Sequence, residues 1–270
     1  MSKGEELAAS LYEALENSEP EVAAELAVEL LAHSRDPEHR LLAATGLLEG
    51  GETERALGVL EALSNGDLDE EQAELRTLRL GECRYNLGEP QTALALLESV
   101  PTRDSKDKGE RKWWIGLCHD HLGDRVQADL CFREASQLDP VGLPPPASIT
   151  PHEAAALVDD VVRQFPAPLR RAIEEIPVVI DDLPPLAVIR SSGGAVHPDT
   201  LGLYTGVSLS ERSHLDPSML PSMIQIFRRN LERFALDREE LEEEIRITLL
   251  HEIGHHLGLD EGGVDALGLG

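Results

Sequence analysis

The chain has 270 residues and a formal net charge of −27, from 51 acidic and 24 basic side chains. This length exceeds the usual size of one hydrophobic core, so it predicts two folded units. The negative charge argues against nucleic acid and anionic membranes as partners, because both require basic surfaces.

An internal repeat occupies the first half of the chain. In three units, a glycine is followed five residues later by an alanine and nine residues later by a bulky apolar residue, and a small residue lies seven positions before it. These units are Ala44, Gly51, Ala56 and Leu60; Gly81, Gly88, Ala93 and Leu97; Gly116, Gly123, Ala128 and Phe132; a weaker upstream unit contains Ala23, Ala27 and Leu30. Small residues let paired helices approach closely and glycine turns the chain between them, so the pattern predicts stacked helix pairs.

This series resembles the tetratricopeptide repeat, although the tryptophan typical of that repeat is missing. The resemblance implies an all-α helical array over residues 1–140. Such arrays commonly bind a peptide or a partner protein on a curved surface. The alternative is a scaffold or dimer surface with no dedicated ligand, because repeats need their neighbours simply to bury their own faces.

A proline-rich segment over residues 141–150 follows the array. Pro144, Pro145 and Pro146 cannot extend a helix and favour a stiff extended spacer, so we expect the domain boundary here. The second domain then covers residues 151–270. Its apolar patterns predict helices over 153–165 and 169–175 and strands over 177–180 and 223–227.

A long helix is predicted between Asp237 and Leu257. Asp237 and Glu240 have the pattern of a capping box, and Gly258 suits the left-handed turn that ends a helix. The residues expected on its apolar back are Leu249, Leu250, Ile253 and Leu257. The opposite face is then available for polar side chains that bind a ligand.

That face carries a His-Glu-x-x-His motif. His251 and His255 lie one turn apart, so both imidazoles can bind the same metal ion. Glu252, about 100° further round the helix, can reach a water bound to that metal and accept its proton. The motif predicts a zinc site with Glu252 as the catalytic general base. Thr248 is a candidate to support the site, and His256 is expected to point sideways without binding the metal.

A catalytic zinc ion usually has three protein ligands and a water in the fourth position. In the metzincin spacing, a glycine follows the second histidine by three residues and the third ligand lies three residues further on. Those positions are Gly258 and Glu261 in this chain. We therefore predict His251, His255 and Glu261 as the zinc ligands, with Asp260 as the alternative to Glu261.

The C-terminal half resembles the minimal zincins, small bacterial proteins with a metallopeptidase-like fold. The resemblance lies in residues 247–261, in the upstream stretch 201–207 and in the closing Leu267-Gly268. It implies a compact α+β zincin core, a zinc ion held by the two histidines and an acidic residue, and Glu252 as the base. The family usually has aspartate at position 261, where this chain has glutamate, and the downstream methionine of true metzincins is missing.

Residues outside the motif also have expected roles. A strand at the edge of the zincin sheet aligns the extended substrate by backbone hydrogen bonds, and the strand over 223–227 is the candidate. Tyr204 and Arg212 are candidates to stabilise an oxyanion. Loop positions are expected for His197, Asp199 and His214.

The chain also has the features of a cytoplasmic protein. No segment approaches the roughly 18 apolar residues of a membrane span, and the N-terminal region has no secretory signal pattern. Cys83, Cys118 and Cys131 form no Cys-x-x-Cys pair, so we expect reduced core residues.

The sequence thus predicts an α+β protein, with an all-α tetratricopeptide-like array before a small zincin-like α+β metallopeptidase domain. The expected function is zinc-dependent hydrolysis of peptide bonds, with the repeats recruiting a protein or peptide. The alternative is an adaptor whose repeats bind a partner and whose zincin-like half binds metal without catalysis. We expect no nucleic acid and no membrane as partners.

Overall fold

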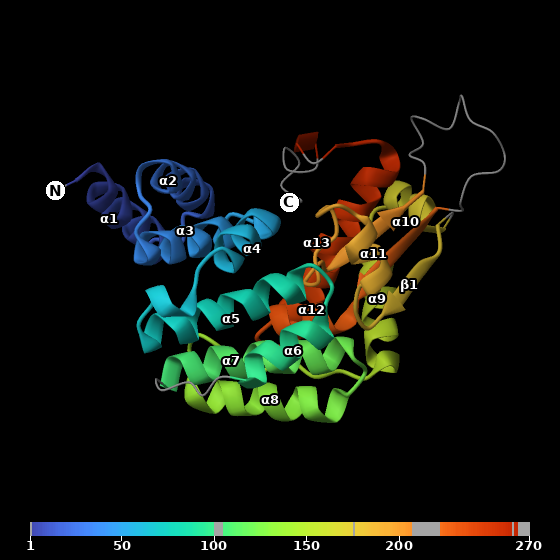
Figure 1. Ribbon diagram of the computed structural model, residues 1–270. Coiled ribbons are helices and arrows are strands. Elements are labelled where there is room, and N and C mark those ends of the chain that lie inside the picture. Colours follow the sequence, from blue (N-terminus) through green and yellow to red (C-terminus); the bar gives the residue numbers. More distant parts are fainter. Residues whose placement is uncertain (1, 100–104, 175, 207–221, 261, 264–270) are drawn as a thin grey trace. The chain divides into compact units, whose positions relative to one another are not determined.

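The computed structural model describes residues 2–99, 105–174, 176–206, 222–260 and 262–263. The chain forms two compact units (Figure 1). The repeat unit is Met1–Leu143 with Ile189–Gly194, and the motif unit is Pro144–Val188 with Ala195–Gly270. No helix in the described part of the chain is long and apolar enough to cross a membrane.

The repeat unit is an array of helices in which each helix contacts the next along the chain. The helices are α1 (Lys3–Glu16), α2 (Pro20–His33), α3 (Pro37–Glu49), α4 (Thr53–Glu61), α5 (Glu70–Asn86), α6 (Pro90–Ser99), α7 (Ser105–His121) and α8 (Arg125–Leu138). The first helices of successive pairs also touch, because α1 contacts α3, α3 contacts α5 and α5 contacts α7. Stacked helix pairs have this contact pattern, so the predicted all-α array is confirmed.

Residues with a left-handed backbone turn the chain between the two helices of each pair. Gly51, Gly88 and Gly123 have φ angles of 77°, 76° and 84°, which glycine adopts without the strain that a Cβ causes. Ser18 occupies the same position in the first pair, five residues before Ala23, and its φ is 55°. The first pair is therefore a full member of the series, with serine where the others have glycine.

The small residues of the repeat lie where its helices approach most closely. A Cβ on Gly81 would lie 2.7 Å from the Leu97 side chain, and one on Gly116 would lie 2.7 Å from the Phe132 ring. Both distances are too short for carbon contacts. The repeat alanines are fully buried at Ala23, Ala56, Ala93 and Ala128. The free cysteines of this unit are buried too, as predicted, at Cys83, Cys118 and Cys131.

The motif unit combines helices with a small sheet, which confirms the predicted α+β class. Its elements are α9 (Pro151–Gln164), α10 (Ala167–Glu174), β1 (Val178–Asp181), β2 (Gly202–Thr205), β3 (Met223–Phe227), α12 (Arg228–Phe234) and α13 (Arg238–Leu257). The residues of α11 (Leu186–Ser191) are divided between the two units. Sequence patterns located α9, α10, β1, β3 and α13, but not α11, β2 or α12.

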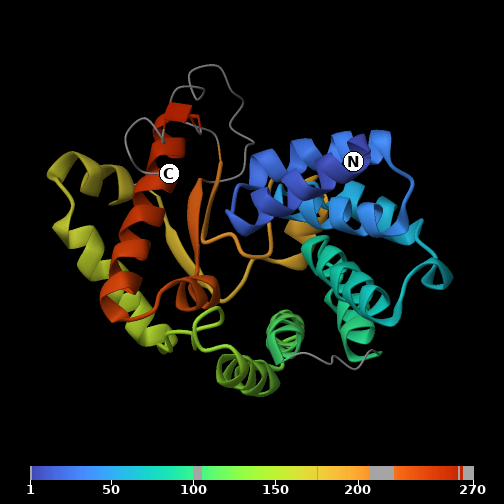
Figure 2. The same cartoon turned by 90° about the vertical axis from the view of Figure 1, so that its left-hand side faces the viewer.

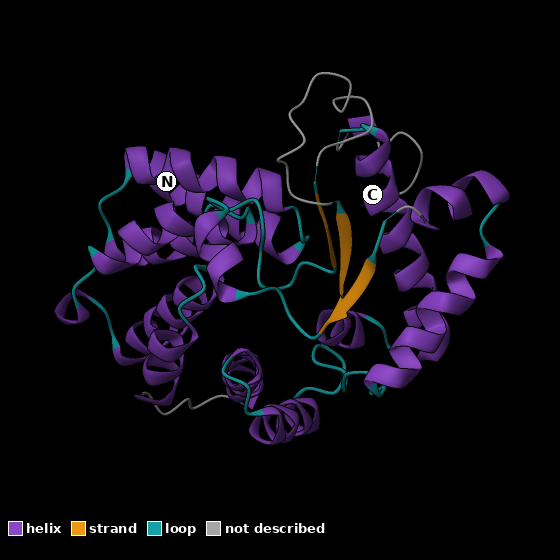
Figure 3. Cartoon of the chain, turned by 90° about the vertical axis from the view of Figure 1, so that its right-hand side faces the viewer, coloured by secondary structure: helices purple, strands orange, loops and turns teal. Residues whose placement is uncertain are grey.

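The strands form a sheet in the order β1-β3-β2, with β3 parallel to β1 and antiparallel to β2 (Figure 3). Helix α13 packs against β2 and β3, beside the sheet (Figure 2). Because β3 is paired on both sides, the prediction that residues 223–227 form the substrate-aligning edge is wrong. The alternating pattern of β3 reflects its buried residues, Ile224 and Ile226, and a pattern of this kind does not reveal a strand's neighbours.

A buried ion-pair cluster in α12 binds the end of the proline-rich segment. Arg228 and Glu232 form an ion pair with side-chain exposures of 6% and 1%. Arg228 also contacts Asp182 at 2.5 Å and donates a hydrogen bond to the carbonyl of Ile149 at 2.8 Å. The backbone carbonyl of Glu232 accepts a hydrogen bond from the N–H of Ala147 at 2.7 Å. Its carboxylate accepts a second one from the N–H of Ile149 at 3.1 Å. This end of the segment is thus part of the motif unit.

Candidate metal centre

Helix α13 begins and ends as its sequence predicts. The Asp237 carboxylate accepts hydrogen bonds from the N–H groups of Glu239 and Glu240 at 2.8 and 3.0 Å. The predicted capping box is not completed, because the Glu240 side chain reaches back to the N–H of Leu236, one residue before the cap, at 2.8 Å, and not to that of Asp237. At the other end, Gly258 has a φ of 95° and turns the chain out of the helix. Both ends of the helix that carries the motif are therefore fixed.

The back of α13 lies in the core of the motif unit. Its almost fully buried residues are Leu241, Ile245, Leu249 and Ile253. The prediction that Leu257 also faces the core is wrong, because Leu257 is 44% exposed. It is the last residue of the helix, directly before the turn at Gly258.

The two histidines of the motif converge at their Nε2 atoms, which lie 3.0 Å apart. Two nitrogens at about 2.0–2.1 Å from one zinc ion with tetrahedral angles lie about 3.3 Å apart, so the pair fits a shared zinc ion. The Nδ1 of His255 lies 3.2 Å from the carbonyl oxygen of Leu259. Because a carbonyl only accepts, Nδ1 carries the proton and Nε2 of His255 presents its lone pair. The imidazole is thus oriented for a metal ligand.

Glu252 is buried on the same helix, and a strand holds its carboxylate. The residue is 6% exposed, and the backbone N–H of Tyr204 in β2 donates to its Oε2 at 2.6 Å. Gly202 permits this approach of β2 to α13. A Cβ there would lie 2.5 Å from Cγ2 of Thr248 and 3.0 Å from Oε1 of Glu252. Thr248 is therefore part of the contact surface that supports the site.

His256 has different neighbours from the two histidines of the motif. It is fully buried, and its Nδ1 lies 3.2 Å from the hydroxyl oxygen of Tyr204. The two rings pack edge to face with centroids 5.5 Å apart. The Tyr204 hydroxyl in turn donates to Oγ of Ser222 at 3.1 Å. These contacts within the unit engage the hydroxyl, which argues against a role for it as an oxyanion donor.

The third ligand stays a prediction, because Glu261 lies outside the described residues. The alternative, Asp260, is exposed, and its Oδ1 accepts a hydrogen bond from the N–H of Gly263 at 2.9 Å. Among the described residues, no group of three histidine, cysteine, aspartate or glutamate side chains is arranged to hold a metal ion. Of the three predicted ligands, the structure therefore describes two, His251 and His255, and their imidazoles lie side by side.

Two families match this chain. Residues 173–269 match the zincin-like metallopeptidase family, and residues 78–106 match the tetratricopeptide repeat. The motif unit is zincin-like. The first match includes every strand of the sheet and the whole of α13, and both resemblances found in the sequence are confirmed. No curated protein matches the chain.

Two parts of the zincin-like site are not predicted by sequence patterns. Strand β2 is only four residues long, and its glycine has no apolar side chain that would signal burial. The contribution of Tyr204 to Glu252 comes from its backbone N–H, which every residue except proline possesses. The available signal is the alternation of Leu201, Gly202 and Leu203, which is too short to separate a strand from a loop.

Other polar residues of the zincin-like unit were expected to be loop residues. His197 and Asp199 form a local ion pair, with Nδ1 and Oδ1 3.2 Å apart, in the segment before β2. Their hydrogen bond raises the pKa of the imidazole and lowers the pKa of the carboxyl group. Arg212 and His214 lie outside the described residues.

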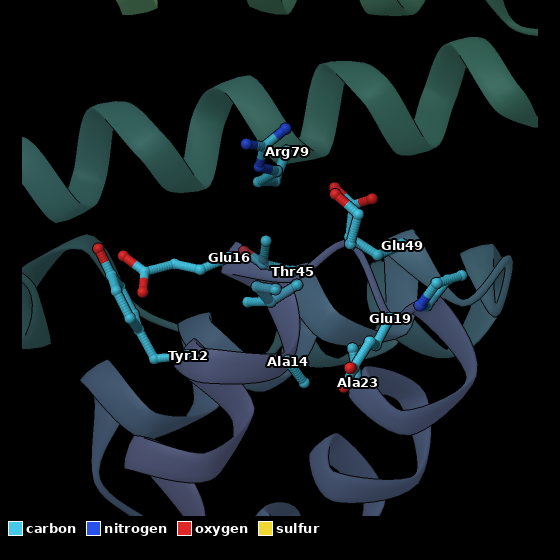
Figure 4. Close-up of a pocket in the computed structure, with 11 residues that line it drawn as sticks. Tyr12, Ala14, Glu16, Glu19, Ala23, Thr45, Glu49 and Arg79 are labelled. Carbon is cyan, nitrogen blue, oxygen red and sulfur yellow. The ribbon is translucent and has the colours of Figure 1, made fainter.

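The repeat unit contains a pocket of about 680 Å³ between α1, α2, α3 and α5 (Figure 4). Its charged and aromatic lining residues are Tyr12, Glu16, Glu19, Glu49 and Arg79. Three carboxylates against one guanidinium make the pocket acidic. It is a concave surface that belongs wholly to the repeats.

Proposed function

We propose that the zincin-like unit is a zinc-dependent peptidase in which His251, His255 and Glu261 bind the metal and Glu252 is the general base. The observation that carries this proposal is the approach of the two Nε2 atoms to 3.0 Å, with Glu252 held on the same helix by β2. The family match over residues 173–269 supports the same class of reaction.

A zinc ion bound by these residues supplies Lewis acidity toward the scissile carbonyl and lowers the pKa of a bound water. Glu252 accepts the proton of the attacking water and passes it to the leaving amine. The hydrogen bond from the Tyr204 N–H fixes the direction of the carboxylate before substrate arrives. The carbonyl of Leu259 orients His255 in the same manner.

The variant Glu252→Gln tests this mechanism. Glutamine preserves the size of the side chain, and its amide oxygen can still accept the hydrogen bond from Tyr204, but it cannot take up a proton. We expect the variant to keep zinc, measured by mass spectrometry of the purified protein. Cleavage of a broad peptide library should fall by about 10²–10⁴-fold. Equal cleavage rates for the variant and the wild type would refute the mechanism.

The matched control is His255→Ala, which removes a ligand and not the base. It should lose zinc and cleavage together, because two remaining ligands hold the metal weakly. Of these two variants, Glu252→Gln alone should lose cleavage with full zinc content.

We also propose that the repeats, residues 1–140, recruit the substrate protein and are joined by residues 141–150 to the peptidase of residues 151–270. The tetratricopeptide match and the acidic pocket support a partner-binding role. The buried free cysteines suit a reducing compartment, so we propose a cytoplasmic location.

The rival function is an adaptor whose zincin-like unit binds metal without catalysis. The observation that favours it is the pocket in the repeat unit, which needs no peptidase to bind a partner. One zinc ion per chain, no cleavage of any peptide in the library, and a partner bound by the repeats would together support the adaptor.

A further inference from the structure

One residue of β2 contacts one turn of α13 at two points. The backbone N–H of Tyr204 donates to Oε2 of Glu252 at 2.6 Å, and its hydroxyl lies 3.2 Å from Nδ1 of His256. Glu252 and His256 are four residues apart, so they lie one above the other on one face of the helix. The two metal-binding histidines form a parallel row displaced by one residue. This part of α13 thus has two rows of side chains. His251 and His255 form the row proposed to bind the metal, and Glu252 and His256 form the row that contacts Tyr204.

Because Glu252 and His256 are buried, losing a hydrogen bond at either residue costs more free energy than it would on an exposed surface. His256 is fully buried and Glu252 is 6% exposed, so water does not replace a lost partner there. If the site of His256 needed only packing, a leucine would fill it without the desolvation cost of an imidazole. The imidazole instead meets the Tyr204 hydroxyl, which is held from its other side by Ser222 at 3.1 Å.

We propose that His256 and Tyr204 are positioning residues for Glu252. Their contact fixes the distance between β2 and α13, and so holds the Tyr204 N–H against the carboxylate. Neither side chain touches the substrate or carries a proton in the reaction. The role assigned to Glu252 rests on the proposed peptidase function, but the coupling of His256 to the Tyr204 N–H does not.

The kinetic test compares His256→Leu, His256→Asn and Tyr204→Phe with the wild type. We expect His256→Leu and Tyr204→Phe to keep one zinc ion per chain and the wild-type KM, and to lower kcat by about 10- to 100-fold. Asparagine places an amide near the position of Nδ1, so His256→Asn should recover most of the loss. The double variant Tyr204→Phe with His256→Leu should be no slower than the worse single variant, because both remove the same contact.

His152→Leu is the matched control for His256→Leu, since His152 is an exposed histidine on α9. It should leave kcat unchanged. If His256→Leu and Tyr204→Phe lower only the melting temperature, with unchanged kcat per zinc-loaded molecule, their role is structural and the proposal is wrong.

A second measurement needs no peptidase activity. The chain has three tyrosines, so labelling with ¹⁵N-tyrosine gives three amide signals, and the one lost in Tyr204→Phe belongs to Tyr204. We expect that amide to exchange slowly with solvent in the wild type and to exchange faster in His256→Leu, with the signals of Tyr12 and Tyr85 unaffected. An unchanged Tyr204 amide in His256→Leu would overturn the proposal. A wild-type protein that shows this coupling and cleaves no peptide would overturn only the peptidase function.

Discussion

The substitution Gly202→Ala would insert a methyl group between β2 and the helix that carries the motif. Its Cβ would lie 2.5 Å from Cγ2 of Thr248, and 3.0 and 3.2 Å from Oε1 and Cγ of Glu252. Carbon atoms in contact normally lie about 3.5–4.0 Å apart, so strand and helix must separate locally by about 1 Å. Gly202 is not among the residues with positive φ, so alanine meets a steric obstacle and no backbone strain.

The expected loss has a thermodynamic and a kinetic part. Overpacking costs about 1–3 kcal/mol, and the lower entropy of the unfolded chain offsets about 0.4–1 kcal/mol, so the free energy of unfolding should fall by about 1–2 kcal/mol. A displacement of about 1 Å in the Tyr204 N–H also moves the carboxylate of Glu252, which should lower kcat about 100-fold. Zinc content should stay at the wild-type level, because His251 and His255 lie on the other row of the helix.

Urea unfolding and peptide cleavage by zinc-loaded protein measure the two parts. Gly58→Ala is the control, because a Cβ there meets nothing within 4 Å and should stabilise α4 by about 0.5–1 kcal/mol. Thr248→Ser removes the closest obstacle, so combining it with Gly202→Ala should cost about 1 kcal/mol less than the two single changes together. Strict additivity, or a Gly202→Ala protein as stable and active as the wild type, would refute the reasoning.

Three further predictions concern stability and reactivity. Ser18→Gly should raise the free energy of unfolding by about 0.5–1 kcal/mol, because serine at a φ of 55° is strained and glycine is not; an unchanged urea midpoint would contradict this. Burial raises the pKa of the Cys83 and Cys118 thiols to about 12, so at pH 8 a disulfide reagent should modify neither until urea is added. Arg228→Met should cost about 3–5 kcal/mol in urea unfolding, because the buried Glu232 is left with the longer ion pair to Arg229, at 3.3 Å; a loss below about 1 kcal/mol would show that Arg229 or water replaces the Arg228 guanidinium.

The repeats were predictable because their signal is periodic and steric. Each unit requires a small residue at the same position, so an alanine recurs every 33 to 37 residues along the sequence. Ala56, Ala93 and Ala128 are all fully buried. The turn of the first pair lacks a glycine, so its place was visible only through Ala23 five residues later. The structure then shows that Ser18 holds the left-handed position.

The sheet was predictable in part. Alternation in residues 223–227 gives β3 its observed bounds, with Ile224 and Ile226 buried. Its central place depends on pairing with β1 and β2, which are separated from it in sequence, and no local pattern encodes such pairing. Sequence rules also do not predict the burial of Arg228 and Glu232, because charged residues are normally exposed. The further partners of Arg228 in the motif unit, Asp182 and the carbonyl of Ile149, are distant in sequence.

A zinc-binding motif on a helix does not by itself position its general base. The helix fixes Glu252 one residue after His251, but a hydrogen bond from another element, the N–H of Tyr204, sets the direction of the carboxylate. A motif that occurs by chance on an exposed helix has no such partner, and its glutamate is free to change rotamer. Close packing at Gly202 and the burial of Glu252 therefore favour a structured site over a chance match of the motif. Because both features belong to the contact between β2 and α13, substitutions in that contact should lower kcat by about 10- to 100-fold while zinc binding persists.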